Sequence, residues 1–154
     1  RYNLMPYLYS MAGWVNLKDY TMLRGLVMDF SSDAKVNNIG NQWMFGPALM
    51  ACPVEYYKAR NREVYFPEQC GWYDLYTGRH INGGQNLIVD APYERIPVFV
   101  REGSIIPFGP SMEWSDEKKR DVPVCVKTEY VDGENIKADI WYQLKNRKFV
   151  EVTE

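Results

Sequence analysis

Apolar residues at the start of the chain follow a helical repeat. From Leu4 onward they recur at the spacing of one helix face: Leu4, Tyr7, Leu8, Met11, Ala12 and Val15. Asn3 has the side chain of a helix N-cap, and Pro6 falls in the first turn, where proline is tolerated. The pattern therefore predicts a helix over residues 4–17.

The following segment is predicted to form a buried strand and a second helix. Thr21–Phe30 is an apolar run with one charge near each end, a pattern typical of a strand that is buried on both faces. Residues 31–33 follow as turn and cap residues, and residues 37–45 can form a short helix. Helix, buried strand, loop and helix make one repeat of a parallel α/β structure, which cannot close a barrel alone.

From Pro47 onward the chain consists of short apolar runs separated by turn residues. The runs before residue 110 are four to seven residues long: ALMACPV, REVYF, WYDLY, NLIV, PVFV and SIIP. Gly103 is expected at positive φ in the turn between the last two runs. Runs of this length and spacing predict an antiparallel β-sandwich.

Alternation within these runs predicts which side chains share a face. In PVFV, Val98 and Val100 are predicted on one face and Phe99 on the other, because successive strand residues point to opposite sides. By the same rule, Ile105 is predicted to point inward and Ile106 to the opposite side.

The last third of the chain is first strongly charged and then β-like. Residues 113–120, EWSDEKKR, form the most charged segment and are expected to be a solvated loop. Asp132-Gly133 is expected to make a hairpin turn. Three further runs are predicted to be strands: VPVCVKTEYV, IKADIWYQL and RKFVEV.

Composition and charge narrow the classes of function. Hydrophobic residues at 46% and aromatic residues at 15% supply a core and argue against disorder. The formal net charge is -2, and the sequence contains no basic stripe that would indicate nucleic-acid binding. No apolar run approaches the roughly 20 residues of a membrane span. Cys52, Cys70 and Cys125 lie far apart and form no metal motif with His80, the single histidine. We therefore predict neither a metal nor a cofactor, and the cysteines do not identify a compartment.

Three segments carry a distinctive order of motifs: RYNLMPYLYS at 1–10, NQWMFGPALMACPV at 41–54, and GWYDLYTG through VREGSIIPFGP at 71–110. In that order they resemble a late barrel helix, the barrel-to-sandwich junction and the following sandwich of glycoside hydrolase family 31, the α-glucosidases and α-xylosidases. The resemblance covers about the first 110 residues. Beyond them it is weak, because the family continues with a longer second sandwich.

The resemblance implies a mainly β fold with a short α/β segment: the partial last repeat of a (β/α)8 barrel, followed by an antiparallel β-sandwich. Residues 1–47 would be the end of the catalytic barrel, 48–112 the proximal C-terminal sandwich, and 113–154 a charged loop with an atypical β segment. The chain would be the C-terminal part of a retaining α-glycosidase that hydrolyses terminal α-xylosidic or α-glucosidic bonds. A stand-alone carbohydrate-binding sandwich and a truncated, non-functional product stay open as alternatives.

Catalysis is expected to lie outside this chain. Retaining glycosidases use two carboxylates about 5 Å apart, one as nucleophile and one as general acid and base. In family 31 these aspartates belong to earlier barrel strands, so the resemblance places them before Arg1. Asp29 and Phe30 are the candidate substrate-binding residues, because they end the one barrel-like strand, and such strand ends face the active site. Asp29 can equally pair with Arg24.

Two further expectations concern binding. Trp72, Tyr73 and Tyr76 form an aromatic cluster that can stack on a sugar ring, with core packing as the alternative. The parent's expected partner is an oligosaccharide, bound through the missing barrel. Without that barrel the chain is expected to expose apolar side chains and to self-associate. Expected members of the exposed patch are Leu8, Met11, Val27 and Met28.

Overall fold

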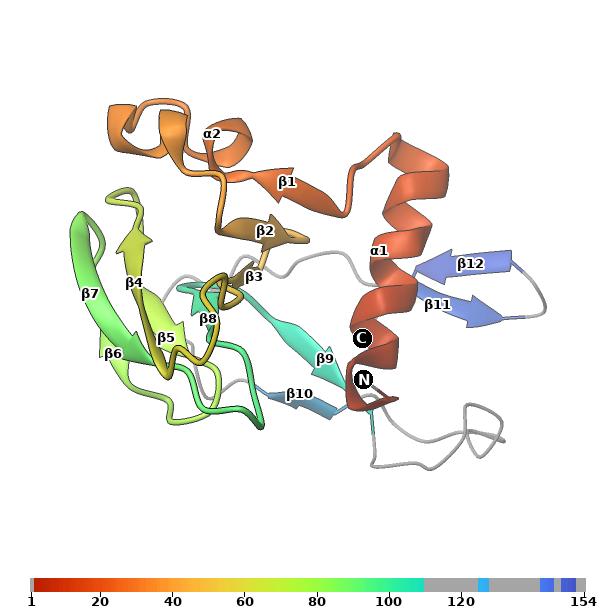
Figure 1. The fold of residues 1–154 in the computed structure, drawn as a ribbon. Coiled ribbons are helices and arrows are strands. Elements are labelled where there is room, and N and C mark those ends of the chain that lie inside the picture. The colour runs from red at the N-terminus through yellow and green to blue at the C-terminus, as the bar shows by residue number, and fades with distance from the viewer. Residues whose placement is uncertain (1, 110–124, 128–141, 146–147, 152–154) are drawn as a thin grey trace.

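Strands dominate the computed structural model, which describes residues 2–109, 125–127, 142–145 and 148–151 (Figure 1). In chain order the strands are β1 (Leu23–Gly25), β2 (Trp43–Phe45), β3 (Leu49–Ala51), β4 (Asn61–Phe66), β5 (Trp72–Asp74), β6 (His80–Ile81), β7 (Gln85–Asp90), β8 (Val98–Arg101), β9 (Ile106–Phe108), β10 (Cys125–Lys127), β11 (Tyr142–Lys145) and β12 (Lys148–Glu151). The helical elements are η1 (Tyr2–Leu4), α1 (Met5–Lys18), α2 (Leu26–Asp29) and η2 (Ala34–Asn38). The fold is mainly β, as the sequence predicts.

One antiparallel sheet of six strands organises the fold. Its strands lie in the order β1-β2-β3-β8-β5-β6, so β8 is an interior strand, with Phe99 opposite Met50 of β3 and Asp74 of β5. Strands β4 and β7 form a separate two-stranded sheet, as do β9 with β10 and β11 with β12. All of these pairs are antiparallel, in agreement with the predicted sandwich.

Two apolar clusters hold these layers together. The first includes side chains of the six-stranded sheet and of the β4–β7 sheet, and in it Phe66 packs against both Trp72 and Phe99. The second gathers around α1, where Tyr7 and Met11 are fully buried. Figure 1 accordingly shows α1 and the β4–β7 sheet on opposite sides of the molecule, with the longer sheet between them. The sheet is thus covered on both faces.

Strand β8 contributes to both clusters. Phe99 belongs to the first cluster, whereas Val98 and Val100 pack with the second, so the predicted alternation is confirmed. The prediction for Ile105 and Ile106 is wrong, because both belong to the second cluster. Strand β9 begins only at Ile106, so Ile105 still belongs to the turn and is not bound by strand alternation.

The turn before β9 has the backbone conformation predicted from its glycine. Gly103 has a φ of 76°, in the left-handed region that side chains other than glycine rarely adopt. A Cβ added there would meet no atom within 4 Å. The backbone conformation, and not a lack of space, is therefore what favours glycine at this position.

Only the first part of the predicted strand at 21–30 is a strand. It ends at Gly25, and α2 follows directly. Leu26 and Phe30, four residues apart, are fully buried, while Val27 and Met28 between them are exposed. A helical turn places residues i and i+4 on one side, whereas a strand would also bury the residue midway between them. Burial therefore favours the helix here.

The prediction of a short helix at 37–45 is also wrong, and so is that of Asn3 as N-cap. Residues 34–38 form the short 3-10 helix η2, and β2 then lies between β1 and β3, with Met44 fully buried. Strand pairing on both sides outweighs the local helical pattern. The helix predicted at 4–17 is confirmed as α1, but its N-cap position is Leu4, which makes no side-chain cap.

The predicted boundary and the strands predicted in the last third can each be placed on the observed sheets. The predicted boundary at residue 47 falls within the six-stranded sheet, since β2 precedes it and β3 follows. The strands predicted in the last third overlap β10, β11 and β12. The charged segment 113–120 and the turn at Asp132-Gly133 lie outside the described residues.

Candidate functional site

The two residues proposed to face a substrate lie side by side but in different surroundings. Asp29, at the end of α2, accepts hydrogen bonds from Arg24 Nε at 3.0 Å to each carboxylate oxygen. This bond is the main reason why the pKa of Arg24 is raised. Phe30 is fully buried, with its ring centroid 5.8 Å from that of Trp72. The pairing of Asp29 with Arg24 is the alternative that the sequence left open.

A buried carboxylate fixes the loop after α2 to strand β4. Asp33 is only 2% exposed and accepts hydrogen bonds from the Tyr65 hydroxyl at 2.6 Å, Lys35 N at 3.1 Å and Glu68 N at 3.3 Å. Burial alone raises the pKa of Asp33, but these donors together outweigh it and hold the pKa below its ordinary value. Asp33 is therefore a charged anchor for this loop. The sequence predicts Asp33 as a turn or cap residue, but it identifies neither Lys35 nor Tyr65 as its partner.

A buried glutamine reinforces the same junction. Gln42 donates from Nε2 to the Tyr65 carbonyl at 2.6 Å and accepts from Tyr65 N at 2.9 Å through Oε1. The side chain thus pairs with the backbone of β4 as a neighbouring strand would. Both bonds satisfy polar groups that would be costly to bury without partners. The sequence carries no signal for this contact, because the two residues are 23 positions apart.

The remaining polar candidates form local contacts. His80 Nε2 lies 3.9 Å from Glu102 Oε1, and Glu102 Oε2 accepts from Gly71 N at 3.0 Å. Burial raises the pKa of the Cys52 thiol to about 12, so this cysteine is a core residue. The described residues hold no group of three or more His, Cys, Asp or Glu placed to bind a metal ion. None of the helices in the described part of the chain has the length and apolar character to cross a bilayer.

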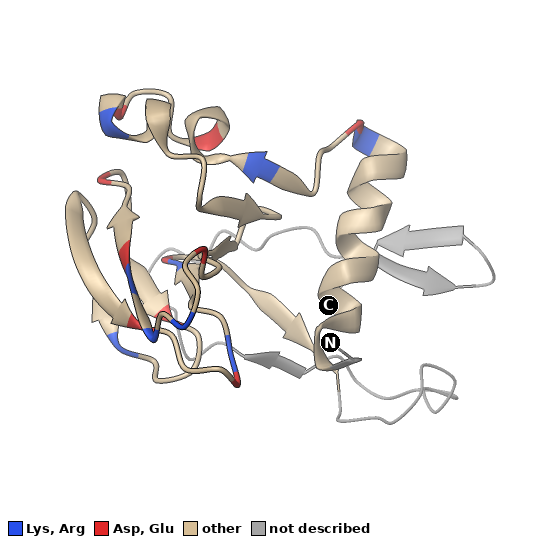
Figure 2. Ribbon diagram, in the orientation of Figure 1, with Lys and Arg blue, Asp and Glu red and all other residues tan. Residues whose placement is uncertain are grey.

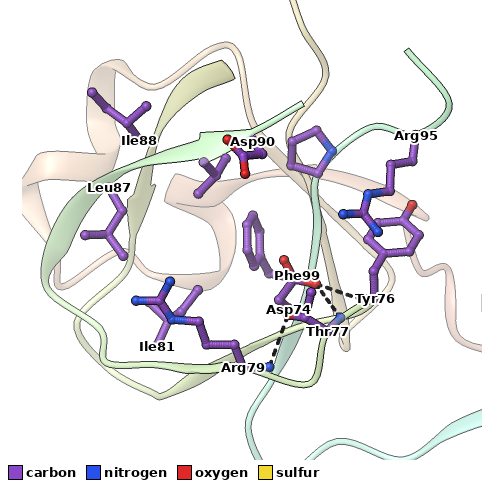
Figure 3. A pocket seen from close by; sticks show the side chains of 12 residues that line it. Asp74, Tyr76, Thr77, Arg79, Ile81, Leu87, Ile88, Asp90, Arg95 and Phe99 are labelled. Carbon is purple, nitrogen blue, oxygen red and sulfur yellow. Dashed lines mark hydrogen bonds between the residues drawn. The ribbon is translucent and has the colours of Figure 1, made fainter. Parts of the chain in front are cut away.

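A cavity of about 270 Å³ lies in the sandwich, beside the turn that joins β5 to β6 (Figure 3). Its apolar lining comes from Ile81, Leu87, Ile88, Val89, Pro97 and Phe99. Its polar lining comes from Asp74, Tyr76, Thr77, Arg79, Asp90 and Arg95. Neither the cavity nor strand β6 is predicted from the sequence, although Tyr76 belongs to the predicted aromatic cluster.

The turn at the cavity is fixed by one carboxylate oxygen and one stacked pair. Asp74 Oδ1 accepts from Tyr76 N at 2.8 Å and from Thr77 N at 2.9 Å. The guanidinium of Arg95 lies over the Tyr76 ring, 4.5 Å from its centroid. Partial burial raises the pKa of the Tyr76 hydroxyl above its ordinary value of 10.0, so the hydroxyl stays protonated and the side chain uncharged at pH 7. The aromatic cluster is divided, because Trp72 is fully buried while Tyr76 is 44% exposed.

Known proteins resemble this chain in both sequence and fold. A family model described as the glycosyl hydrolase family 31 C-terminal domain matches residues 19–106, more than half of the chain. The chain belongs to glycoside hydrolase family 31. The resemblance inferred from its motifs is thereby confirmed, and the family is one of glycosidases.

Relatives of both expected kinds match the chain. It is 41% identical over 107 residues to an alpha-xylosidase of Saccharolobus solfataricus, covering 70% of this chain and 15% of that protein. It is 32% identical over 133 residues to neutral alpha-glucosidase C of Homo sapiens, covering 83% of this chain and 15% of that protein. The crystal structure of a family 31 alpha-xylosidase from Xanthomonas citri matches with a TM-score of 0.73 and 44% identity, covering 76% of this chain and 13% of that one. The chain therefore spans only about 15% of the length of the curated relatives it matches.

Proposed function

We propose that this chain is the C-terminal supporting part of a retaining α-glycosidase, which hydrolyses terminal α-xylosidic or α-glucosidic bonds. The observation that carries the proposal is the match to the family's C-terminal domain over residues 19–106. In this proposal residues 1–47 complete a catalytic barrel, 48–112 form the proximal sandwich, and 113–154 form an atypical β extension. The partner is an oligosaccharide bound by the barrel.

The apolar character of α1 and its neighbours favours the proposal that this part of the chain packs against a barrel. This helix carries no charged side chain before Lys18, and Figure 2 shows it almost free of charge, in contrast to the sandwich loops. Beside it, β1 ends the six-stranded sheet as an edge strand. Large apolar side chains are exposed on α1 and on the two elements that follow it: Val15 and Leu17 on α1, Leu23 on β1, and Val27 and Met28 on α2. A largely apolar surface next to a strand that ends its sheet among the described residues is suited to burial against a further domain.

Only some of the residues that were expected in the exposed apolar patch are exposed. Val27 and Met28 are exposed, as expected. Met11 is fully buried against the sheet, so its predicted exposure is wrong, and Leu8 is half-buried. We propose that the remaining exposed apolar residues drive self-association of the isolated chain, since no barrel covers them there.

The chemistry is proposed to lie in the barrel and not in this chain. Asp29 is neutralised by Arg24 and Asp33 is enclosed by donors, so neither carboxylate stands in the paired, accessible arrangement that a retaining mechanism needs. Of the two candidate substrate residues, only Asp29 reaches the surface, because Phe30 is fully buried. The proposal of a substrate contact therefore concerns Asp29, at the rim of the barrel.

The chain is 41% and 44% identical to the two α-xylosidases, against 32% for neutral alpha-glucosidase C. This difference favours α-xylosides as the substrate class. The experiment is to express the longer protein that contains this chain and to measure release of nitrophenol from 4-nitrophenyl α-xyloside and α-glucoside. We expect hydrolysis of at least one, with the α-xyloside preferred. A longer protein that binds saccharides without hydrolysing either substrate would favour a carbohydrate-binding module, and one that does neither would favour a non-functional product.

A further inference from the structure

The cavity beside the β5–β6 turn has the chemistry of a small binding site. It lies between the two sheets, with Leu87 and Phe99 contributing to an apolar wall (Figure 3). At about 270 Å³ it is slightly smaller than the roughly 300–1,000 Å³ of pockets for drug-sized ligands. It therefore fits a ligand of one or two rings and not a long chain.

The polar lining is balanced in charge. Two aspartates and two arginines line the cavity, so their formal charges cancel. A site with no net charge gives no preference for an anion or a cation. Among the described residues, Oδ2 of Asp74 has no hydrogen-bond donor, because the two donors of the turn both bind Oδ1. Oδ2 of Asp74 can accept a hydrogen bond, and the Arg79 guanidinium can donate one. The cavity therefore offers both kinds of hydrogen-bonding group to an uncharged ligand.

Tyr76 adds a flat apolar surface to this polar lining. Tyr76 is 44% exposed, and the Arg95 guanidinium that stacks on one face of its ring holds it in place. A pyranose ring has C–H faces that pack on apolar and aromatic surfaces, and hydroxyl edges that bond to carboxylates and guanidinium groups. The cavity offers an aromatic ring and hydrogen-bonding side chains side by side. Ligand pockets in general combine a mainly apolar lining with a few polar groups that orient the ligand.

We propose that this cavity is a non-catalytic saccharide site that binds one or two pyranose units of an α-linked oligosaccharide. Tyr76 supplies the stacking surface, and Asp74 and Arg79 supply hydrogen bonds to hydroxyl groups. The choice of a saccharide rests on the proposed function, which brings such molecules to the protein. The site itself rests on the cavity and its lining, and it makes and breaks no covalent bond.

The test is a titration of the 15N-labelled chain carrying Leu23→Lys and Met28→Lys, which lie outside the cavity and limit self-association, followed by amide chemical shifts, with methyl α-xyloside, methyl α-glucoside and maltotriose as probes. We expect saturable shifts confined to residues 74–81 and 87–89. Tyr76→Ala is expected to weaken binding by about 2–12-fold, the range for one aromatic contact. Arg79→Ala is expected to weaken it as well, and because Arg79 lies in an exposed turn, this variant keeps the test valid if Tyr76→Ala does not fold.

Tyr93→Ala is the matched control. Tyr93 is 75% exposed and also stacks under an arginine, with Arg60 3.1 Å from its ring centroid, but it does not line the cavity. Its replacement is expected to leave binding unchanged. Absence of saturable shifts with all three probes, or binding that both cavity variants leave intact, would overturn the proposal. The titration does not measure hydrolysis, so the site can fail here while the longer protein still cleaves its glycoside.

Discussion

Removing one hydroxyl group tests how the loop after α2 is held on the sandwich. The Tyr65 hydroxyl donates to Asp33 at 2.6 Å, and Asp33 is 2% exposed. A hydrogen bond to a charged group is worth about 1.5–3 kcal/mol, so Tyr65→Phe should lower the free energy of unfolding by that amount at neutral pH. For a chain of this size the loss corresponds to a decrease in Tm of about 3–12 °C.

The loss should depend on pH in a defined direction. The pKa of Asp33 is held below its ordinary value of 3.8 in the folded protein. A carboxyl group with a lowered folded-state pKa stabilises the fold fully above its unfolded pKa, and this stability is lost as the pH falls through the folded pKa. Since the Tyr65 hydroxyl contributes to the lowered pKa, the difference between wild type and Tyr65→Phe should be largest at neutral pH. It should shrink once the pH falls below 3.8.

The assay is urea unfolding followed by tryptophan fluorescence, at neutral pH and again below pH 3.8. Tyr57→Phe is the control, because Tyr57 is 90% exposed and its replacement should change stability by less than about 0.5 kcal/mol. A Tyr65→Phe loss as small as that of the control would refute the anchoring role. A full-sized loss that is the same at both pH values would show that the bond does not act through the Asp33 charge.

Backbone strain at Gly103, the burial of Cys52 and the exposed apolar side chains each lead to a measurable result. Gly103→Val should cost about 1–3 kcal/mol, because valine is strained at a φ of 76°, and equal urea midpoints for variant and wild type would contradict this. Cys52 should react with a thiol reagent at neutral pH only after unfolding, because its pKa is about 12; rapid labelling of the native chain at this position would count against its burial. The isolated chain should form oligomers in light scattering, and Leu23→Lys with Met28→Lys should reduce them; a clean wild-type monomer would argue that the exposed apolar surface is stable in water.

The sequence predicted elements whose signal is local and periodic. Strand β8 is the best case, because Phe99 and its two valine neighbours alternate between two clusters, as the period of a strand requires. The helix α1 was predictable from its apolar spacing, and Gly103 from the order of its turn residues. The family resemblance rests on such local motifs, so it too could be drawn without coordinates.

Predictions failed where distant partners decide the structure. Leu26 and Phe30 lie on one buried helical face because they pack on the first apolar cluster. The sequence of Thr21–Phe30 carries no local signal of this packing. The bond between Asp33 and Tyr65 joins residues 32 positions apart. The cavity likewise combines the turn after β5 with side chains of β7. Pairings of this kind depend on the packing of whole sheets, which local patterns do not encode.

Activity measured on the isolated chain shows whether the catalytic residues lie inside or outside residues 1–154. A purified sample of residues 1–154, free of host glycosidase, should release no nitrophenol from 4-nitrophenyl α-xyloside or α-glucoside above the buffer rate. This result is expected because the two catalytic carboxylates are proposed to lie in the barrel. Turnover by the isolated chain that is lost in Asp29→Asn or Asp33→Asn would contradict the account, since it would place the reaction among residues that the structure assigns to ion pairing and loop anchoring.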